Sequence, residues 1–312
     1  MASSERAIPR RKLGRTGVTV SALGLGGYHL GTIKSERTAI RLLHEAVDGG
    51  ITFMDNAWEY HDGRSERLMG KALSGGWRER VFLMTKVCTH GRGRKTAMAQ
   101  LEESLRRLRT DHLDLWQVHE VAYGNDPQMH YAKHGVLDAF DQARRQGKVR
   151  FVGFTGHKDP SLHLAMLKGG YPFDTCQLPL NCFDATFRSF ETQVLPELAR
   201  RGIAAIGMKP FGGEGEMIEK GAVSATEALR YAMSLPVATT LTGIDSPRIL
   251  RQDLRIARGF VPLGKGAMET LRRRLARHAA DGRYELYKTS MRHEGPIGRE
   301  QHGFPSDEEL GA

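Results

Sequence analysis

Four side chains that can hold or transfer a proton stand at the ends of apolar runs or close behind one. Asp55 ends the run FMD, Lys86 ends VFLMTK, His119 ends LDLWQVH, and Tyr60 lies five residues beyond Asp55. A buried lysine needs an acidic partner, and Asp55 is the nearest candidate. Because an ammonium group beside a phenol favours the phenolate, we expect Lys86 to lower the pKa of Tyr60. Tyr60 would then protonate a carbonyl oxygen that His119 orients by a hydrogen bond.

Each of these residues also has a structural explanation when it is considered alone. An aspartate after a strand commonly forms a turn or a helix cap, and a lysine at a strand end usually points into water. A single histidine or loop tyrosine usually belongs to the packing. The coincidence favours chemistry, because three successive apolar runs end in ionisable residues that would face the same end of the protein.

The elements that must position these residues alternate along the chain. Short apolar runs predict eight buried strands: Val18–Leu25, Thr52–Met54, Val81–Thr85, Leu113–Val118, Val149–Thr155, Thr175–Leu178, Ile203–Met208 and Thr239–Ile244. Amphipathic segments between them predict helices: Arg37–Gly49, Thr96–Leu108, Val136–Gln146, Leu162–Lys168, Phe187–Arg201, Ala225–Ser234 and Pro247–Arg258. Successive strand ends lie roughly 30 residues apart, which is the length of one βαβ unit.

The glycine-rich stretch after the first run distinguishes a closed barrel from an open sheet. An open dinucleotide-binding sheet should carry GxGxxG at this point. In the stretch Gly24–Gly31, His29 stands where the last glycine of that pattern would be. The sequence therefore predicts an α/β protein of the (β/α)8 TIM-barrel class.

Two additions frame the predicted barrel. Arg11–Ser21 predicts an N-terminal β-hairpin around a Thr-Gly turn. Met268–Ala280 predicts a C-terminal helix, and a polar tail follows from Asp281 to Ala312. We expect residues 1–260 to form the barrel and residues 261–312 to form a C-terminal extension of the same domain.

The charge balance leaves three interpretations. The chain has 46 Lys+Arg against 36 Asp+Glu, which gives a formal net charge of +10. Such a charge is compatible with nucleic-acid binding, with attraction of phosphorylated ligands, or with a solvated Arg-rich surface. No basic motif interleaved with aromatic residues supports nucleic-acid binding. We expect most of the positive charge to lie on a solvated surface and a small part of it to contact phosphate groups of a ligand. We expect no nucleic-acid partner.

Targeting segments are not visible in the sequence. Met1–Arg11 lacks the apolar core of a secretory leader, and the uncharged stretch Thr16–Ile33 contains five glycines, which is unsuited to a membrane span. Cys88, Cys176 and Cys182 lack the paired spacing of a disulfide framework or a metal site. We expect a cytoplasmic protein with reduced thiols and no membrane partner.

Together these motifs resemble the aldo-keto reductase superfamily, of which the chain looks like a divergent branch. The resemblance rests on RKLGRTGVTVSALGLGG, DNAWEYHDGRSERLMGKAL, VFLMTK and LDLWQVH, and it covers roughly residues 10–260. It implies a (β/α)8 barrel that uses NADPH or NADH to reduce aldehydes or ketones. It also implies that Asp55, Tyr60, Lys86 and His119 are the family's catalytic tetrad.

The resemblance implies a nicotinamide site with departures from the family pattern. Gln177 matches the glutamine that binds the nicotinamide carboxamide. Thr155 keeps the hydroxyl of the family's Ser-Asn pair, but Gly156 replaces the amide. Met208 stands where many members carry an aromatic residue against the nicotinamide ring, and a thioether can also pack on a ring face.

The rest of the cofactor is expected to contact later loops. Lys209 and the backbone around Phe211 suit the pyrophosphate. Arg248 is the candidate for a 2′-phosphate, and Asp253 for the adenine. Asp245 would lie near that phosphate and repel it. We therefore expect a preference for NADPH over NADH, but not an exclusive use of NADPH. The remaining cofactor contacts implied are Gly27, Tyr28, Asp55 and Gly243.

Substrate contacts are expected from Tyr28, Trp58 and His119, with the loop Glu120–His134 shaping the pocket. His130, His134 and His157 lie in different loops without tight ligand spacing, so no metal site is expected.

The leading hypothesis is therefore an NADP(H)-dependent oxidoreductase acting on small-molecule carbonyl compounds, with the proton supplied by Tyr60. An alternative is a cofactor-binding regulatory or sensor subunit that retains the barrel. The polar tail Met291–Phe304 suits either a lid over the barrel mouth or contacts in a homo-oligomer, and the sequence leaves both open.

Overall fold

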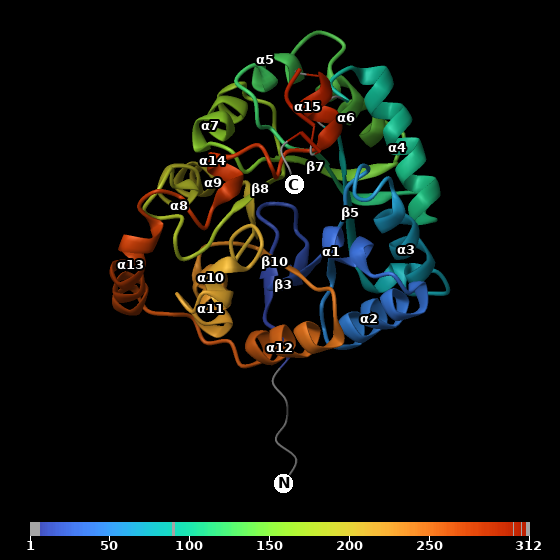
Figure 1. Cartoon of the computed structure of the whole chain (residues 1–312). Coiled ribbons are helices and arrows are strands. Elements are labelled where there is room, and N and C mark those ends of the chain that lie inside the picture. Colours follow the sequence, from blue (N-terminus) through green and yellow to red (C-terminus); the bar gives the residue numbers. More distant parts are fainter. Residues whose placement is uncertain (1–6, 89–90, 302, 307, 310–312) are drawn as a thin grey trace.

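Eight parallel strands form a closed barrel in the computed structural model, which describes residues 7–88, 91–301, 303–306 and 308–309. The strands follow one another around the barrel in chain order, with the last, β10, paired to the first, β3 (Figure 1). They are β3 (Leu23–Gly26), β4 (Phe53–Asp55), β5 (Phe82–Val87), β6 (Leu113–Val118), β7 (Val149–Thr155), β8 (Thr175–Pro179), β9 (Ala204–Met208) and β10 (Thr239–Gly243). The predicted (β/α)8 barrel is confirmed.

Helices surround the barrel and cover its outer face (Figure 1). The longer ones are α2 (Glu36–Asp48), α3 (Arg64–Leu73), α4 (Arg94–Leu108), α6 (Val136–Arg145), α7 (Pro160–Lys168), α9 (Leu195–Arg201), α11 (Ala225–Ser234), α12 (Pro247–Arg258) and α13 (Lys265–Ala279). The shorter ones are α1 (Gly27–Thr32), η1 (Arg78–Arg80), α5 (Asp126–His130), α8 (Phe190–Gln193), α10 (Glu216–Glu219), α14 (Leu286–Thr289) and α15 (Pro296–Gln301).

The core has two parts, one outside and one inside the strands. The larger cluster joins the outer face of the strands to the helices, as in α2, where Leu42, Leu43 and Val47 are buried on one face. That helix is capped by Ser35, whose side chain accepts a hydrogen bond from the backbone N–H of Thr38. The smaller cluster fills the barrel interior and includes Phe53, Phe82, Leu115 and Ile206.

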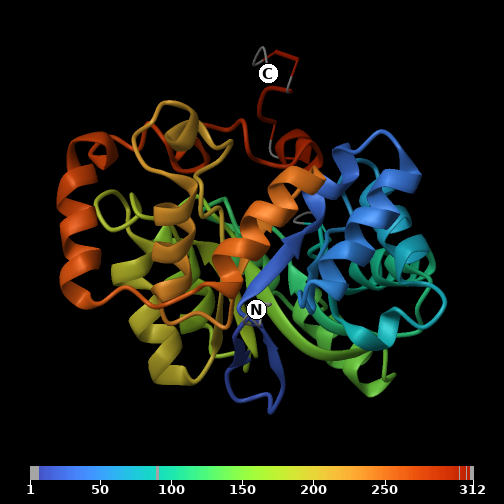
Figure 2. The same ribbon diagram turned by 90° about the horizontal axis from the view of Figure 1, so that it is seen from below.

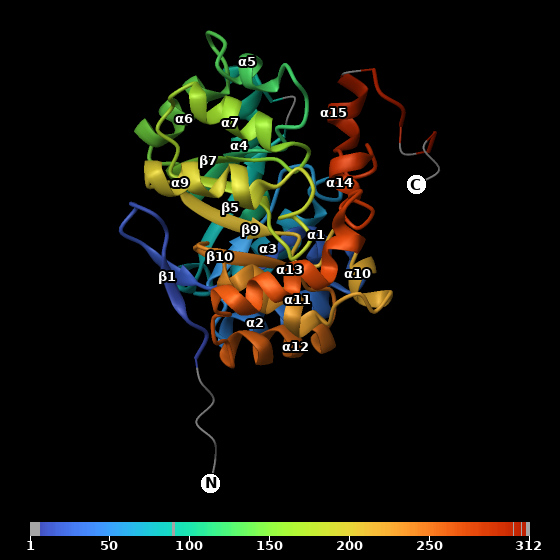
Figure 3. The same ribbon diagram turned by 90° about the vertical axis from the view of Figure 1, so that its left-hand side faces the viewer.

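The N-terminal hairpin is confirmed, and it closes one end of the barrel. Strand β1 (Arg10–Lys12) pairs antiparallel with β2 (Thr19–Ser21). Leu13 and Val20 from the hairpin are fully buried in the interior cluster. Figures 2 and 3 show the hairpin at one end of the barrel and α14–α15 at the opposite end.

Two predicted elements are interrupted. The predicted strand Val18–Leu25 divides at Ala22 into β2 and β3, because Ser21 and Thr52 exchange side-chain and backbone hydrogen bonds that turn the chain from the hairpin into the barrel. The predicted helix Phe187–Arg201 divides at Val194 into α8 and α9. Pro196 opens α9, where its missing N–H costs no helical hydrogen bond.

The C-terminal segment is tied to the barrel by buried charges. Lys288 Nζ lies 2.6 Å from Asp184 Oδ1 and 2.9 Å from Glu285 Oε1, and these side chains are at most 1% exposed. Asn181 donates a hydrogen bond of 2.9 Å to the hydroxyl of Tyr287. Because Asn181 and Asp184 follow β8, this cluster holds the segment against the carboxyl ends of the strands. The proposed division at residue 260 stays a prediction.

No helix among the described residues is both long and apolar enough to cross a lipid bilayer. The prediction that the N-terminus lacks a leader falls partly on residues 1–6, which lie outside the described residues.

Candidate active site

A buried ion pair stands at the carboxyl ends of β4 and β5. Lys86 Nζ lies 2.6 Å from Asp55 Oδ1, and it also donates a hydrogen bond of 2.8 Å to the backbone oxygen of Asn56. The two charged side chains are 1% and 5% exposed. Burial lowers the pKa of Lys86, and the charge of Asp55 opposes that change. The expected pairing therefore forms because neighbouring parallel strands bring both residues to the same end of the barrel.

Tyr60 is brought to this pair by a tight turn. The backbone N–H of Trp58 donates a hydrogen bond to the backbone oxygen of Lys86, and the backbone N–H of Tyr60 donates one to the backbone oxygen of Ala57. The Tyr60 hydroxyl lies 3.3 Å from Lys86 Nζ. Burial raises the pKa of Tyr60 well above its usual value, and Asp55 and other carboxylates add to the rise. The expectation that Lys86 lowers this pKa is wrong, because burial and nearby negative charges outweigh a lysine that already has an acidic partner.

His119 lies against Tyr60 and is held by a residue that the sequence did not single out. The two rings meet edge to face with centroids 5.5 Å apart. His119 Nδ1 contacts Glu59 Oε1, and the other oxygen of Glu59 accepts a hydrogen bond of 2.7 Å from the thiol of Cys88. A signal for Glu59 was present, because it directly precedes Tyr60 in the turn.

The same turn is fixed from outside the barrel by α3 and α4. Arg107 donates a hydrogen bond of 2.7 Å to the backbone oxygen of Trp58 and forms ion pairs with Glu66 and Glu103. The Trp58 indole donates a hydrogen bond of 2.8 Å to Glu103. The indole N–H is therefore hydrogen-bonded to a residue of α4. The predicted contact of Trp58 with substrate stays a prediction.

A second carboxylate stands beside this group. The Glu120 side chain accepts a hydrogen bond of 2.9 Å from the backbone N–H of Gly295, and His157 Nε2 lies 3.2 Å from its other oxygen. Burial raises the pKa of Glu120 well above its usual value, and Glu59 adds to the rise. A Cβ atom on Gly295 would lie 2.8 Å from Glu59 Oε2, so glycine lets the C-terminal segment approach the carboxylates.

The potential metal ligands in this structure lie beside Tyr60, and they do not include the three histidines that were considered from the sequence. Glu59, His119 and Glu120 each offer one ligand atom within 4.8 Å of the others, and this is the sole such group of three in the described part of the chain. The three histidines considered from the sequence are outside it: His130, His134 and His157.

The predicted nicotinamide residues lie at the carboxyl ends of β7, β8 and β9. Thr155 is paired in register with Gln177, and Gln177 Nε2 lies 3.4 Å from Asp55 Oδ1 and 3.6 Å from Met208 Sδ. Gln177 Oε1 is buried and has no hydrogen-bond partner among the described residues. An amide oxygen of this kind fits a carboxamide N–H, so the residues present fit a nicotinamide group.

Two glycines allow close approach at the ends of β3 and β10. A Cβ atom on Gly27 would lie 2.4 Å from the backbone oxygen of Asp55, and one on Gly243 would lie 2.4 Å from the ring of His29. Tyr28 is 51% exposed, and its ring meets that of Tyr60 edge to face with centroids 5.4 Å apart. His29 was not singled out from the sequence, and burial lowers its pKa.

The loop expected to hold the pyrophosphate is covered by the C-terminal segment. Lys209 Nζ lies 5.2 Å from the centre of the Tyr287 ring, and burial lowers the pKa of this lysine against the charges of Glu120 and Glu214. A Cβ atom on Gly212 would lie 2.6 Å from the backbone oxygen of Tyr284. Phe211 is half-buried against the outer core. The role of Lys209 and Phe211 toward a cofactor stays a prediction.

The two residues expected at the other end of the cofactor lie on α12 in different surroundings. Ser246 caps this helix, and Arg248 is exposed in its first turn. Asp253 is fully buried, and neither of its carboxylate oxygens has a hydrogen-bond partner among the described residues. Burial raises the pKa of Asp253 to about 7.

Replacing Asp253 by Asn is expected to stabilise the protein. Between about pH 4 and 7 the unfolded chain loses the Asp253 proton while the folded chain keeps it, so the wild-type protein loses stability as pH rises through this window. Asn has no charge to bury, and we expect a gain of about 1–3 kcal/mol at pH 8 and little gain at pH 4. Denaturant unfolding at both pH values measures this gain. A loss of stability at pH 8 would contradict it.

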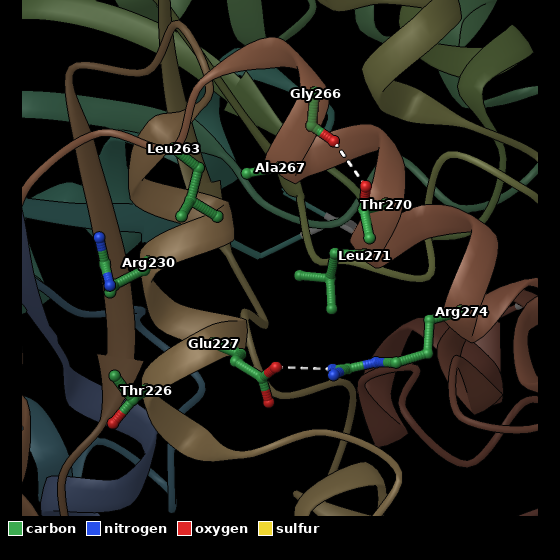
Figure 4. A pocket seen from close by; sticks show the side chains of 9 residues that line it. All are labelled: Thr226, Glu227, Arg230, Leu263, Gly266, Ala267, Thr270, Leu271 and Arg274. Atoms are coloured by element: carbon green, nitrogen blue, oxygen red, sulfur yellow. Dashed lines mark hydrogen bonds and ion pairs between the residues drawn. The ribbon is translucent and has the colours of Figure 1, made fainter.

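Two shallow hollows on the surface lie away from these residues. One is formed between α11 and α13 and is crossed by an ion pair of 2.7 Å between Glu227 and Arg274 (Figure 4). The other is formed between α2 and α12. Neither is lined by the residues at the carboxyl ends of the barrel strands.

Comparisons with known proteins place these features in a family context. Residues 22–221 match the profile of the aldo/keto reductase family. An uncharacterized oxidoreductase of Bacillus subtilis is 31% identical over 220 residues, and a methylglyoxal reductase of Escherichia coli is 30% identical over 202 residues. Each match covers 64% of this chain, and 66% and 67% of those relatives, so the chain spans about two thirds of their length.

A solved structure shares the fold. An aldo-keto reductase from Klebsiella pneumoniae in complex with NADPH superposes with a TM-score of 0.71 at 22% identity, covering 86% of this chain and 96% of that chain. At this level of identity the likeness shows the barrel architecture.

Proposed function

The chain belongs to the aldo/keto reductase family, and from that premise we propose that it is an NADP(H)-dependent oxidoreductase that reduces the carbonyl group of small aldehydes or ketones. The observation that carries the proposal is the buried arrangement of Lys86 between Asp55 and the Tyr60 hydroxyl. A buried ion pair is costly to maintain for stability alone, and here it ends on a group that can donate a proton.

Tyr60 is the proton donor in this proposal. Its phenol is protonated, because burial and the neighbouring carboxylates raise its pKa. Lys86 is fixed by Asp55 and by the backbone oxygen of Asn56, so its remaining hydrogen-bonding capacity is directed to the Tyr60 oxygen. As the phenol gives up its proton, the ammonium group stabilises the negative charge that develops on that oxygen.

The cofactor-binding residues would align the second reactant. Gln177 would hold the carboxamide of a nicotinamide group through its buried amide, with Thr155 beside it and Met208 against the ring. The nicotinamide cofactor supplies the hydride when it is bound. The protein would provide the orientation of both reactants.

Steady-state turnover tests this proposal. NADPH oxidation followed by absorbance with a panel of uncharged aldehydes and ketones should show saturable, enzyme-dependent reduction. NADPH binding without turnover of any member of the panel would contradict it and would favour the regulatory or sensor alternative. A cytoplasmic location and a homo-oligomeric state remain predictions from the sequence.

The preference for NADPH over NADH is a finer part of the proposal and rests on Arg248. This side chain is exposed in the first turn of α12, where a guanidinium suits a 2′-phosphate. We expect Arg248→Ala to weaken NADPH binding about tenfold or more and to leave NADH binding unchanged. Fluorescence titration with both cofactors measures this. Arg251→Ala is the matched control, because Arg251 is on the same helix and pairs with Glu45. Equal losses for both cofactors would contradict the role of Arg248.

A further inference from the structure

Glu59 is in contact with two of the strand ends that build the site. One carboxylate oxygen contacts Nδ1 of His119, which follows β6. The other accepts the Cys88 thiol at 2.7 Å, and Cys88 follows β5. The Glu59 side chain is 8% exposed. The residue after it is Tyr60, so one turn of the chain carries both the phenol and the carboxylate that contacts the histidine.

The chemistry of these contacts determines the direction of the hydrogen bond. An ionised carboxylate has acceptors only, so the imidazole must be the donor, and Nδ1 carries the hydrogen. The thiol donates to the second oxygen in the same way, so that both oxygens act as acceptors. We propose that Glu59 is a positioning residue that fixes the tautomer and the orientation of His119.

The surroundings of Glu59 are rigid enough for this role. Its turn is held by hydrogen bonds from Trp58 and Tyr60 to neighbouring backbone oxygens and by Arg107, which donates to the backbone oxygen of Trp58. His119 itself is fixed through its backbone N–H, which donates to Val87 at 2.8 Å. With both main chains held, the contact between the two side chains sets the plane and the rotation of the imidazole.

A fixed Nδ1–H has a consequence for the reaction, and this step rests on the proposed function. The contact with Glu59 sets the direction in which the imidazole faces the end of the Tyr60 side chain. A change at Glu59 would therefore act on the reaction through the orientation of His119.

The imidazole tautomer can be measured directly on the full chain, without turnover. Long-range ¹H–¹⁵N correlation of histidine-labelled protein distinguishes a ring protonated at Nδ1 from one protonated at Nε2, and His119→Asn identifies the signal. We expect the Nδ1–H form in the wild type and in Glu59→Gln, whose amide oxygen still accepts. We expect Glu59→Leu to shift His119 toward the Nε2–H form, which is the form preferred in water.

Two controls keep the result interpretable. His163 contacts the backbone oxygen of Gln177 and should give an unchanged signal in every variant, which confirms that Glu59→Leu is folded. Glu103→Gln disturbs the opposite side of the same turn and should leave His119 unchanged. An Nε2–H signal in the wild type, or no change in Glu59→Leu, would overturn the proposal. So would an Nδ1–H signal that emerges only after a bound divalent metal has been removed.

Kinetics supply the second readout. Glu59→Leu is expected to lower kcat/KM for an uncharged aldehyde by about tenfold or more, with an unchanged Kd for NADPH, and Glu59→Gln is expected to recover most of the loss. Equal losses in the two variants would show that the charge matters rather than the hydrogen bond, and would also overturn the proposal. If the proposed carbonyl reduction were wrong, the wild type would not turn over, whereas the tautomer measurement would still give its own answer.

Discussion

Tyr60→Phe is expected to lower kcat for carbonyl reduction by about 10²- to 10⁴-fold, which is the contribution typical of a positioned proton donor. The variant removes one hydroxyl, which accepts a hydrogen bond of 3.3 Å from Lys86 Nζ. The ring and its edge-to-face contacts with Tyr28 and His119 remain. The loss should therefore fall on the chemical step, and the Kd for NADPH should stay within about twofold of the wild type.

The neighbouring tyrosine gives a matched control for this prediction. Tyr28→Phe removes a hydroxyl from a ring that touches Tyr60 but is 51% exposed, and it should change kcat by less than about tenfold. Single-turnover kinetics with preformed NADPH complexes separates the chemical step from product release. If Tyr60→Phe reduced aldehydes at a rate within tenfold of the wild type, another group would have to supply the proton.

Lys288→Met is expected to destabilise the protein by about 3–5 kcal/mol. The substitution keeps an unbranched apolar side chain but leaves Asp184 and Glu285 buried together, and both are at most 1% exposed. The backbone oxygen of Phe187 also loses its hydrogen bond of 2.8 Å from the ammonium group. Because this cluster holds residues 281–299 on the barrel, we expect that segment to become the first site of protease cleavage.

Two further variants test whether the buried charge is the cause. Lys288→Met combined with Asp184→Asn should recover part of the lost stability, since one unpaired buried carboxylate has been removed. Arg283→Met breaks the exposed pair with Asp281 in the same segment and should cost less than about 1 kcal/mol. Denaturant unfolding and limited proteolysis provide the measurements. A loss from Lys288→Met no larger than that from Arg283→Met would show that the cluster does not anchor the segment.

The barrel strands were predictable because each is a short apolar run bounded by turn residues. The bounds of β6 and β7 coincide with the predicted runs, Leu113–Val118 and Val149–Thr155. The ten-residue helix α3 was missed, and so were the short helices α1, α5, α10, α14 and α15. Such a short helix has little intrinsic stability and forms where tertiary contacts support it, so its sequence carries no periodic signal.

The sequence predicted that Asp55, Tyr60, Lys86 and His119 come together, but it did not single out Glu59 and it was less informative about the electrostatics. Asp55 and Lys86 come together because parallel neighbouring strands end at the same level, which residue spacing can indicate. The direction of the Tyr60 pKa shift depends on burial and on several carboxylates, which requires coordinates. The contacts of Gly295 with Glu120 and of Lys288 with Asp184 join positions 175 and 104 residues apart, for which a single sequence gives no local signal.

The hairpin that fills one end of the barrel has a consequence for the sequence of binding events. Leu13 and Val20 are fully buried among the interior side chains, so that end offers no passage. A nicotinamide group on Gln177 and a carbonyl compound beside Tyr60 would have to use the other end, where residues 284–295 already lie over the loops. In the proposed function the nicotinamide lies deeper than the carbonyl compound, so it would have to bind before the substrate and leave after the product. We therefore expect a compulsory order of binding if both reactants use this one open end.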